Sequence, residues 1–174
     1  MKRVLKRLIP LTLLLLLASK PGYCAEEYLI KAGFILNFLK FVSWQNVEGN
    51  NPRSVLNICV VSGGAIPQGL LSINNKQSNN RVINVHVYTP DQFDICHVIY
   101  ILANNSDALK NVLPLMATRA VLTIGEHKTF MAENGIINFM IEGKKMRFEI
   151  NRTVAARVGI SISAKLLQLA MRVY

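Results

Sequence analysis

The stretch of sequence that decides the fold is Gly135-Ile-Ile-Asn-Phe-Met-Ile-Glu-Gly-Lys-Lys-Met-Arg-Phe-Glu-Ile-Asn151. Apolar residues alternate along both of its halves, and side chains two positions apart share one face of a strand. The residues that can line a core in this way are Ile137, Phe139, Ile141, Met146, Phe148 and Ile150. Between the halves, Gly143 can adopt the positive φ of a tight turn. The stretch therefore predicts a β-hairpin whose other, half-exposed face carries Asn138, Met140, Arg147 and Glu149.

Two helices are expected after this hairpin. Asn151 is a suitable N-cap for a helix over residues 152–157, because its side chain can accept a hydrogen bond from a free backbone N–H. Gly159 can close that helix. The last helix is expected to start at Ser163.

Strands and helices alternate in the part of the chain before the hairpin. The apolar patterns predict strands at 55–61, 82–87, 95–102 and 120–124. Helices are expected at 26–42, near Pro67, at 106–117 with a kink or early end at Pro114, and at 128–134. This order predicts a three-layer α/β fold with Rossmann-like topology. Its sheet would be mixed but mostly parallel, with helices on both faces and the C-terminal hairpin as an antiparallel edge.

The first 24 residues have the pattern of a signal peptide. A basic segment containing Lys2 and Arg3 precedes the apolar segment 8–18, which is too short to span a membrane. Gly22 and Cys24 are small residues placed for cleavage before Ala25. We therefore expect a signal peptide at 1–24, a single domain at 25–174 and a periplasmic location. A lipid-anchored Cys24 and an uncleaved anchor are the alternatives.

The charge of the chain does not favour nucleic acid as a partner. The leader contains five of the 20 basic residues and none of the 10 acidic residues, so the 15 basic and 10 acidic residues that remain give a formal charge of +5. A nucleic-acid surface would need a denser basic stripe with aromatic residues between the charges.

Two cysteines, Cys59 and Cys96, follow the leader. An even number of cysteines in an oxidising compartment favours a disulfide. Both lie in apolar segments that are expected to be buried strands. The bond would stabilise the fold by up to about 4 kcal/mol in the chain-entropy account. The alternative is two buried free thiols, which behave as small hydrophobic side chains.

Motifs for catalysis, cofactors or metals are not found in the sequence. Gly64 and Gly69 have the spacing of a phosphate loop, but Leu70-Leu71 occupy the positions of its lysine and hydroxyl residue. Cys96 and His97 are adjacent on an expected strand, so they point to opposite faces and cannot share one metal site. We therefore predict a protein that is not an enzyme and has no cofactor.

The expected N-terminal helix is unusually apolar. One stripe contains Ile35 and Leu39, and a second stripe contains Phe34, Phe38 and Phe41, with Trp44 beyond them. One interpretation places the helix between the sheet and the C-terminal helix, since aromatic residues are common in cores. The other interpretation makes Phe34, Phe38, Phe41 and Trp44 a contact surface for a partner or for a homodimer.

Three segments together carry a family resemblance, and it covers nearly all of the chain after the leader. They are Lys31-Ala-Gly-Phe-Ile-Leu-Asn-Phe-Leu-Lys-Phe-Val-Ser-Trp44, the hairpin with its following helix, and Ile160-Ser-Ile-Ser-Ala-Lys-Leu-Leu-Gln-Leu-Ala170. Their order and spacing resemble the YfiR family of bacterial periplasmic regulators. Family members have cysteines at places comparable to Cys59 and Cys96. Some have a second pair in the C-terminal half, which this chain lacks, so redox switching through that pair does not carry over.

The resemblance implies a non-catalytic repressor that acts in cyclic di-GMP signalling and biofilm control. YfiR-type proteins bind the periplasmic part of an inner-membrane diguanylate cyclase and hold it inactive. An outer-membrane lipoprotein can sequester the repressor. The competing hypothesis is a small-ligand binding or sensor domain, because the turn at Ser62-Gly63-Gly64 follows a strand, where α/β sheets bind ligands.

Overall fold

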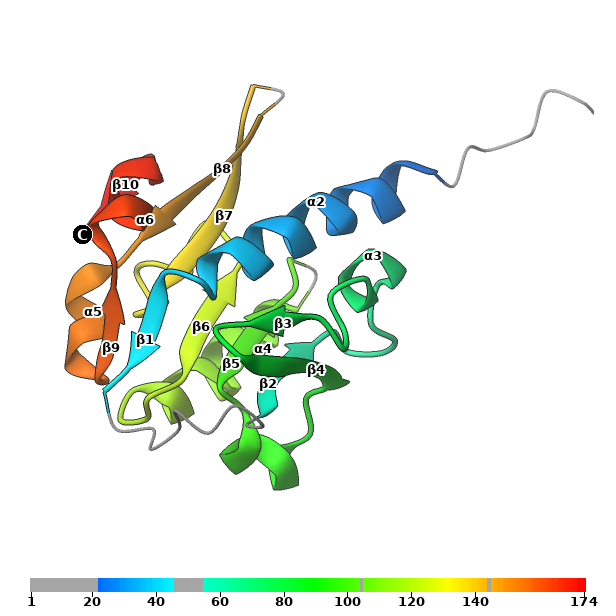
Figure 1. The fold of residues 1–174 in the computed structure, drawn as a ribbon, viewed down its shortest axis with the longest axis horizontal. Coiled ribbons are helices and arrows are strands. Elements are labelled where there is room, and N and C mark those ends of the chain that lie inside the picture. The colour runs from blue at the N-terminus through cyan, green and yellow to red at the C-terminus, as the bar shows by residue number, and fades with distance from the viewer. Residues whose placement is uncertain (1–21, 46–54, 104, 144) are drawn as a thin grey trace, which may run out of the picture.

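An eight-stranded, mostly parallel sheet forms the middle of the computed structural model, in the order β10-β8-β7-β6-β5-β2-β4-β3 (Figure 1). The structure describes residues 22–45, 55–103, 105–143 and 145–174. The expected α/β fold class is confirmed. The expected signal peptide lies outside the described residues, except for its last three positions, whose backbone is helical.

The parallel part of the sheet contains β2 (Val55–Val61), β4 (Arg81–Val87), β5 (Val98–Ile101), β6 (Leu122–Gly125) and β7 (Ile137–Glu142). Three strands complete it: β8 (Lys145–Ile150) is antiparallel to β7, β10 (Arg172–Val173) is parallel to β8, and β3 (Gln77–Ser78) is antiparallel to β4. The chain continues from β2 to β4 on one side and then to β5 on the other. The carboxyl ends of the parallel strands therefore share one edge, where open α/β sheets bind ligands.

Helices cover both faces of the sheet. The helix α2 (Gly22–Phe38) and the short α3 (Gln68–Leu71) pack on one face, where Ile35, Phe38 and Leu39 join the larger apolar core. On the other face, a second core forms under α4 (Ser106–Asn111) and the 3-10 helices η3 (Pro90–Ile95) and η4 (Leu113–Met116). Two further helices, α5 (Arg152–Arg157) and α6 (Ala164–Leu169), lie between β8 and β10 in the sequence.

The predicted hairpin is confirmed as β7 and β8, with Ile137 opposite Ile150 and Phe139 opposite Phe148. These four side chains are buried, and Gly143 has φ +61° in the turn. The tip extends beyond the body of the molecule (Figure 1), which leaves Ile141 61% exposed. The prediction that this residue lines the core was therefore wrong.

The caps after the hairpin also match the prediction. Asn151 Oδ1 accepts a hydrogen bond from Val154 N at 3.0 Å, and Ser163 Oγ accepts one from Leu166 N at 3.4 Å. Gly159 has φ +77° just after α5. In the earlier segment 106–117, the chain divides into α4 and η4. Pro114 lies in the first turn of η4, where its missing N–H is tolerated.

The N-terminal helix ends earlier than predicted, at Phe38 rather than near Val42. Val42–Trp44 instead forms the strand β1, which pairs antiparallel with β9 (Ile160–Ile162) in a separate two-stranded sheet. A β-branched and an aromatic residue suit this extended pairing. The helical spacing of Val42 was misleading, because Val42 is buried as part of a strand.

Two further segments differ from the prediction. Residues 128–134 form consecutive turns rather than a helix. Phe130 is fully buried there between Gly125 and Gly135, where a Cβ on Gly135 would lie 2.0 Å from the ring. Asn134 has φ +63°, a left-handed backbone conformation that cannot continue a right-handed helix. The strand expected from Ile95 begins only at Val98, because the chain leaves η3 at Ile95.

Candidate functional site

A buried polar network joins α2 to the carboxyl ends of β5 and β6. Glu126 directly follows β6, and the alternation of Leu122 and Ile124 places it on the α2 side of the sheet. Its two carboxylate oxygens accept hydrogen bonds from Lys31 Nζ and from the hydroxyl of Tyr100. The Lys31 side chain is 3% exposed and that of Glu126 7%, so this ion pair is almost completely removed from water.

The surroundings of the network keep the proton on Tyr100. Burial, and then the negative charge of Glu126, raise the pKa of Tyr100 well above its ordinary value, so the phenol stays protonated and donates. Lys31 Nζ also lies 2.5 Å from Glu27 and 4.6 Å from the centre of the Tyr28 ring. A buried lysine with such partners is held in one position. The network therefore fixes α2 on the end of the sheet.

A cavity of about 640 Å³ adjoins the network on the other side of Glu126. It lies over the polar face of the hairpin, and residues of the turn after β6 and of the C-terminal segment line its sides. Its polar lining residues are Glu126, Lys128, Asn138, Glu149, Arg172 and Tyr174. The sequence predicted a half-wet face here, but Asn138 and Glu149 are 3% and 5% exposed. The turn and the C-terminal segment, which exclude this water, could not be placed from the sequence.

Hydrogen bonds connect the cavity residues to one another. Glu149 accepts from Asn138 Nδ2 at 3.3 Å through one oxygen and from the Tyr174 hydroxyl at 2.9 Å through the other. Arg172 lies 3.7 Å from the second oxygen. Asn138 Oδ1 is buried, and no donor for it is found within the described residues. Such groups are rare in folded proteins, so this one requires an explanation.

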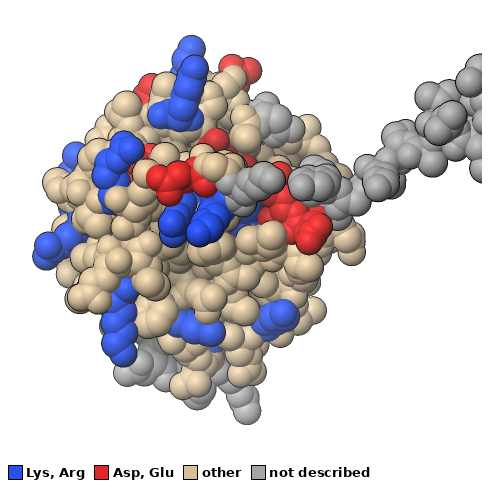
Figure 2. Space-filling view, turned by 90° about the horizontal axis from the view of Figure 1, so that it is seen from above, with Lys and Arg blue, Asp and Glu red and all other residues tan. Residues whose placement is uncertain are grey.

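Exposed apolar side chains on α2 are the second feature of this end of the molecule. The first half of α2 extends beyond the sheet (Figure 1), and Leu29 and Ile30 are 53% and 48% exposed. Figure 2 looks onto this end, where acidic and basic side chains are mixed among wide areas of other residues. The mixture does not form a stripe of one sign on the face that is shown.

The fold and its site can be compared with known protein families. A family model described as YfiR/HmsC-like matches residues 28–171. The chain belongs to the YfiR/HmsC-like family. The resemblance found in the sequence is thereby confirmed. The matched range contains Lys31, Tyr100 and Glu126, whereas Arg172 and Tyr174 of the cavity follow it.

The aromatic residues that were predicted as a partner surface pack against the core of this YfiR/HmsC-like domain. Phe38 is 1% exposed, and its ring centre lies 4.8 Å from that of Phe148 and 5.6 Å from that of Phe139. Phe34 contacts the same two rings at 6.0 and 5.9 Å. Phe41 and Trp44 are half-buried against the same core. All four residues thus pack on the same apolar core.

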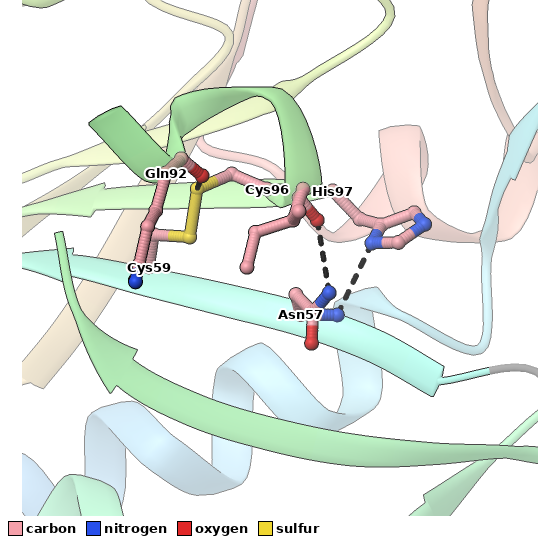
Figure 3. The surroundings of a disulfide bond; sticks show 6 residues. Asn57, Cys59, Gln92, Cys96 and His97 are labelled. Atoms are coloured by element: carbon pink, nitrogen blue, oxygen red, sulfur yellow. Dashed lines mark hydrogen bonds between the residues drawn. A yellow bond between two sulfur atoms is a disulfide. The ribbon is translucent and has the colours of Figure 1, made fainter. Parts of the chain in front are cut away.

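The predicted disulfide is present in the structure (Figure 3). Cys59 lies in β2, Cys96 lies just before the neighbouring β5, and their Cα atoms are 5.8 Å apart. The bond ties the centre of the sheet to the end of η3. Cys96 and His97 point in opposite directions in Figure 3, as expected for neighbours in an extended chain.

His97 is held in its neutral form beside the disulfide. Its Nδ1 accepts a hydrogen bond from Asn57 N at 3.2 Å, which a protonated ring could not do. Burial, and then the positive charge of Arg81, lower the pKa of His97 to about 4, although a hydrogen bond with the Ile95 carbonyl acts in the opposite direction.

The stability of the fold should therefore fall as the pH falls between about 6.5 and 4. In this range the unfolded chain protonates His97 and the folded chain does not, and the loss levels off below the folded pKa. Because the ring is partly exposed, we expect about 1–2 kcal/mol. Urea unfolding at several pH values should give a flatter curve for His97→Gln than for the wild type. Parallel curves would contradict the assignment.

The turn that was considered for ligand binding is closed by its own hydrogen bonds. Ser62 Oγ accepts from Gly64 N at 3.2 Å and donates to Gly64 O at 2.5 Å, and Gly63 has φ +67°. Its hydroxyl is thus used within the turn. Within the described residues, no group of three or more His, Cys, Asp or Glu is placed to hold a metal ion. Among the same residues, no helix is both long and apolar enough to cross a membrane.

Proposed function

We propose that the protein is a periplasmic, non-catalytic regulator that binds the periplasmic domain of an inner-membrane diguanylate cyclase and keeps it inactive. The match to the YfiR/HmsC-like family over residues 28–171 carries this proposal. Repression lowers cyclic di-GMP, and an outer-membrane lipoprotein that sequesters the repressor relieves it. The signal peptide directs secretion and is then removed by cleavage before Ala25, so N-terminal sequencing of the periplasmic form should begin at that residue.

The surface that makes the contact is proposed to be the projecting half of α2. Leu29 and Ile30 are exposed there, and large exposed apolar side chains favour a protein contact. Phe34 and Phe38 contribute indirectly, because they hold the opposite side of the helix on the core. Phe41 and Trp44, which follow the helix, pack on the same core. A homodimer through the same surface would compete with the cyclase for it.

A capture experiment tests this proposal. The mature protein, immobilised and exposed to detergent-solubilised inner membranes, should retain a membrane diguanylate cyclase. A variant with Leu29→Ser and Ile30→Ser should lose most of this capture. Leu115→Ser is the matched control, because Leu115 is 51% exposed but lies on η4, on the other side of the sheet. Capture that is equally strong for all three proteins would contradict the proposed surface, and capture of no cyclase would contradict the function.

A second candidate function is the binding of a small ligand. The cavity beside Glu126 favours it, because about 640 Å³ lies within the usual 300–1,000 Å³ of ligand pockets. The two functions are compatible, since a regulator can respond to a ligand.

A further inference from the structure

We propose that the cavity between the turn after β6, the hairpin and the C-terminal segment binds a small anionic molecule that also carries a hydrogen-bond donor. Hydroxy acids, sugar acids and hydroxylated phosphates have this chemistry. The inference rests on the lining residues alone and does not depend on repression of a cyclase.

The floor of the cavity offers a hydrogen-bond acceptor that lacks a donor. Asn138 is 3% exposed, and its Nδ2 is already committed to Glu149 at 3.3 Å. This bond fixes the orientation of the amide, so Oδ1 must accept its hydrogen bond from another group. No such group is found in the part of the chain that the structure describes. A hydroxyl or N–H of a ligand would satisfy it.

The carboxylates of the lining are already engaged by hydrogen bonds from their own partners. Both oxygens of Glu126 accept hydrogen bonds, from Lys31 and from Tyr100. Both oxygens of Glu149 also accept hydrogen bonds, one from Asn138 and one from Tyr174. All four carboxylate oxygens of the lining therefore already have a hydrogen-bond partner.

The basic residues of the lining, in contrast, still have free donors. Lys128 is exposed, and no acceptor for its ammonium group is found among the described residues. Arg172 uses one nitrogen to donate to the Tyr174 hydroxyl at 3.1 Å and lies 3.7 Å from Glu149. A guanidinium has five N–H donors in a planar fork, so most of them remain for a carboxylate or phosphate. The unused hydrogen-bond donors of the cavity therefore lie on its two basic residues.

The remaining walls suit a short carbon skeleton. Met131 and Met140 are half-buried, and together with Ala132 they line the cavity between the polar groups. Methionine side chains adapt to the shape of what they contact. The site thus combines apolar walls with a few placed polar groups, which is the usual composition of small-molecule sites.

Titration calorimetry of the purified protein with matched pairs of probes tests the proposal. The anions are D-glucuronate, L-lactate and glycerol 3-phosphate, and their neutral counterparts are D-glucose, 1,2-propanediol and glycerol. At least one anion should bind, roughly tenfold or more tightly than its neutral counterpart, because a hydrogen bond to a charged group contributes that much. Whether carboxylates or the phosphate bind identifies the natural anion class.

Variants place the binding in this cavity. Asn138→Leu removes the free acceptor, and Arg172→Gln removes the charge without a change in the core. Each should weaken the bound anion by roughly tenfold. Lys110→Gln, on α4 and outside the lining of the cavity, is the control and should bind as the wild type does. The proposal is overturned if none of the anions binds, if neutral probes bind equally well, or if Arg172→Gln binds with wild-type affinity.

Discussion

Replacing Phe38 by alanine should lower the free energy of unfolding by about 3–5 kcal/mol. Phe38 is 1% exposed, and its ring packs between the rings of Phe34, Phe139 and Phe148. Its removal leaves a cavity between α2 and the hairpin that the surrounding sheet cannot fill. Urea unfolding of the variant and the wild type measures this loss.

Leu29→Ala is the matched control on the same helix. Leu29 is 53% exposed, so its truncation should change stability by less than about 0.5 kcal/mol. It should weaken binding to the partner instead. A wild-type unfolding curve for Phe38→Ala would show that the aromatic residues are not core, and it would return them to the role of a contact surface.

Replacing Lys31 by methionine should lower the free energy of unfolding by a similar amount, about 3–5 kcal/mol. The loss arises because Glu126 would then keep its buried charge without a cation. The double variant Lys31→Met, Glu126→Leu should regain most of the stability, since a buried ion pair can be replaced by apolar residues at little cost. Unfolding of both single variants and the double variant gives the coupling energy directly.

An exposed ion pair on the hairpin provides the comparison. Arg147 and Glu142 lie 3.3 Å apart, with side chains 46% and 52% exposed. Arg147→Met should cost less than about 1 kcal/mol, because water and salt screen such pairs. Equal losses for Lys31→Met and Arg147→Met would contradict the view that burial makes the Lys31–Glu126 pair important.

Much of the fold was predictable because local chemistry and tertiary structure agree there. In the hairpin, the alternation of Ile137 and Phe139 coincides with a buried face, and Gly143 supplies the required φ. The caps at Asn151 and Ser163 depend only on residues within the next turn. The helix expected at 128–134 failed because Phe130 is held by Gly125 and Gly135, and neither contact is visible in a local pattern.

The candidate site was not predictable for a related reason. Lys31 and Glu126 are 95 residues apart, and Tyr100 and Glu126 are 26 apart, so only the sheet order brings them together. Lys31 also lies in a stretch that was interpreted through its aromatic residues. The one available signal was a charged residue directly after an apolar strand, at Glu126, where α/β sheets place functional groups.

The level of cyclic di-GMP in cells tests the central claim most directly. Deleting the gene for this protein should raise cyclic di-GMP, because the cyclase is then no longer held inactive, and restoring the wild-type gene should return it to its original level. The variant with Leu29→Ser and Ile30→Ser should reach the periplasm but fail to restore it. Unchanged cyclic di-GMP after deletion, in cells that contain a membrane diguanylate cyclase with a periplasmic domain, would contradict the claim that this protein is its repressor.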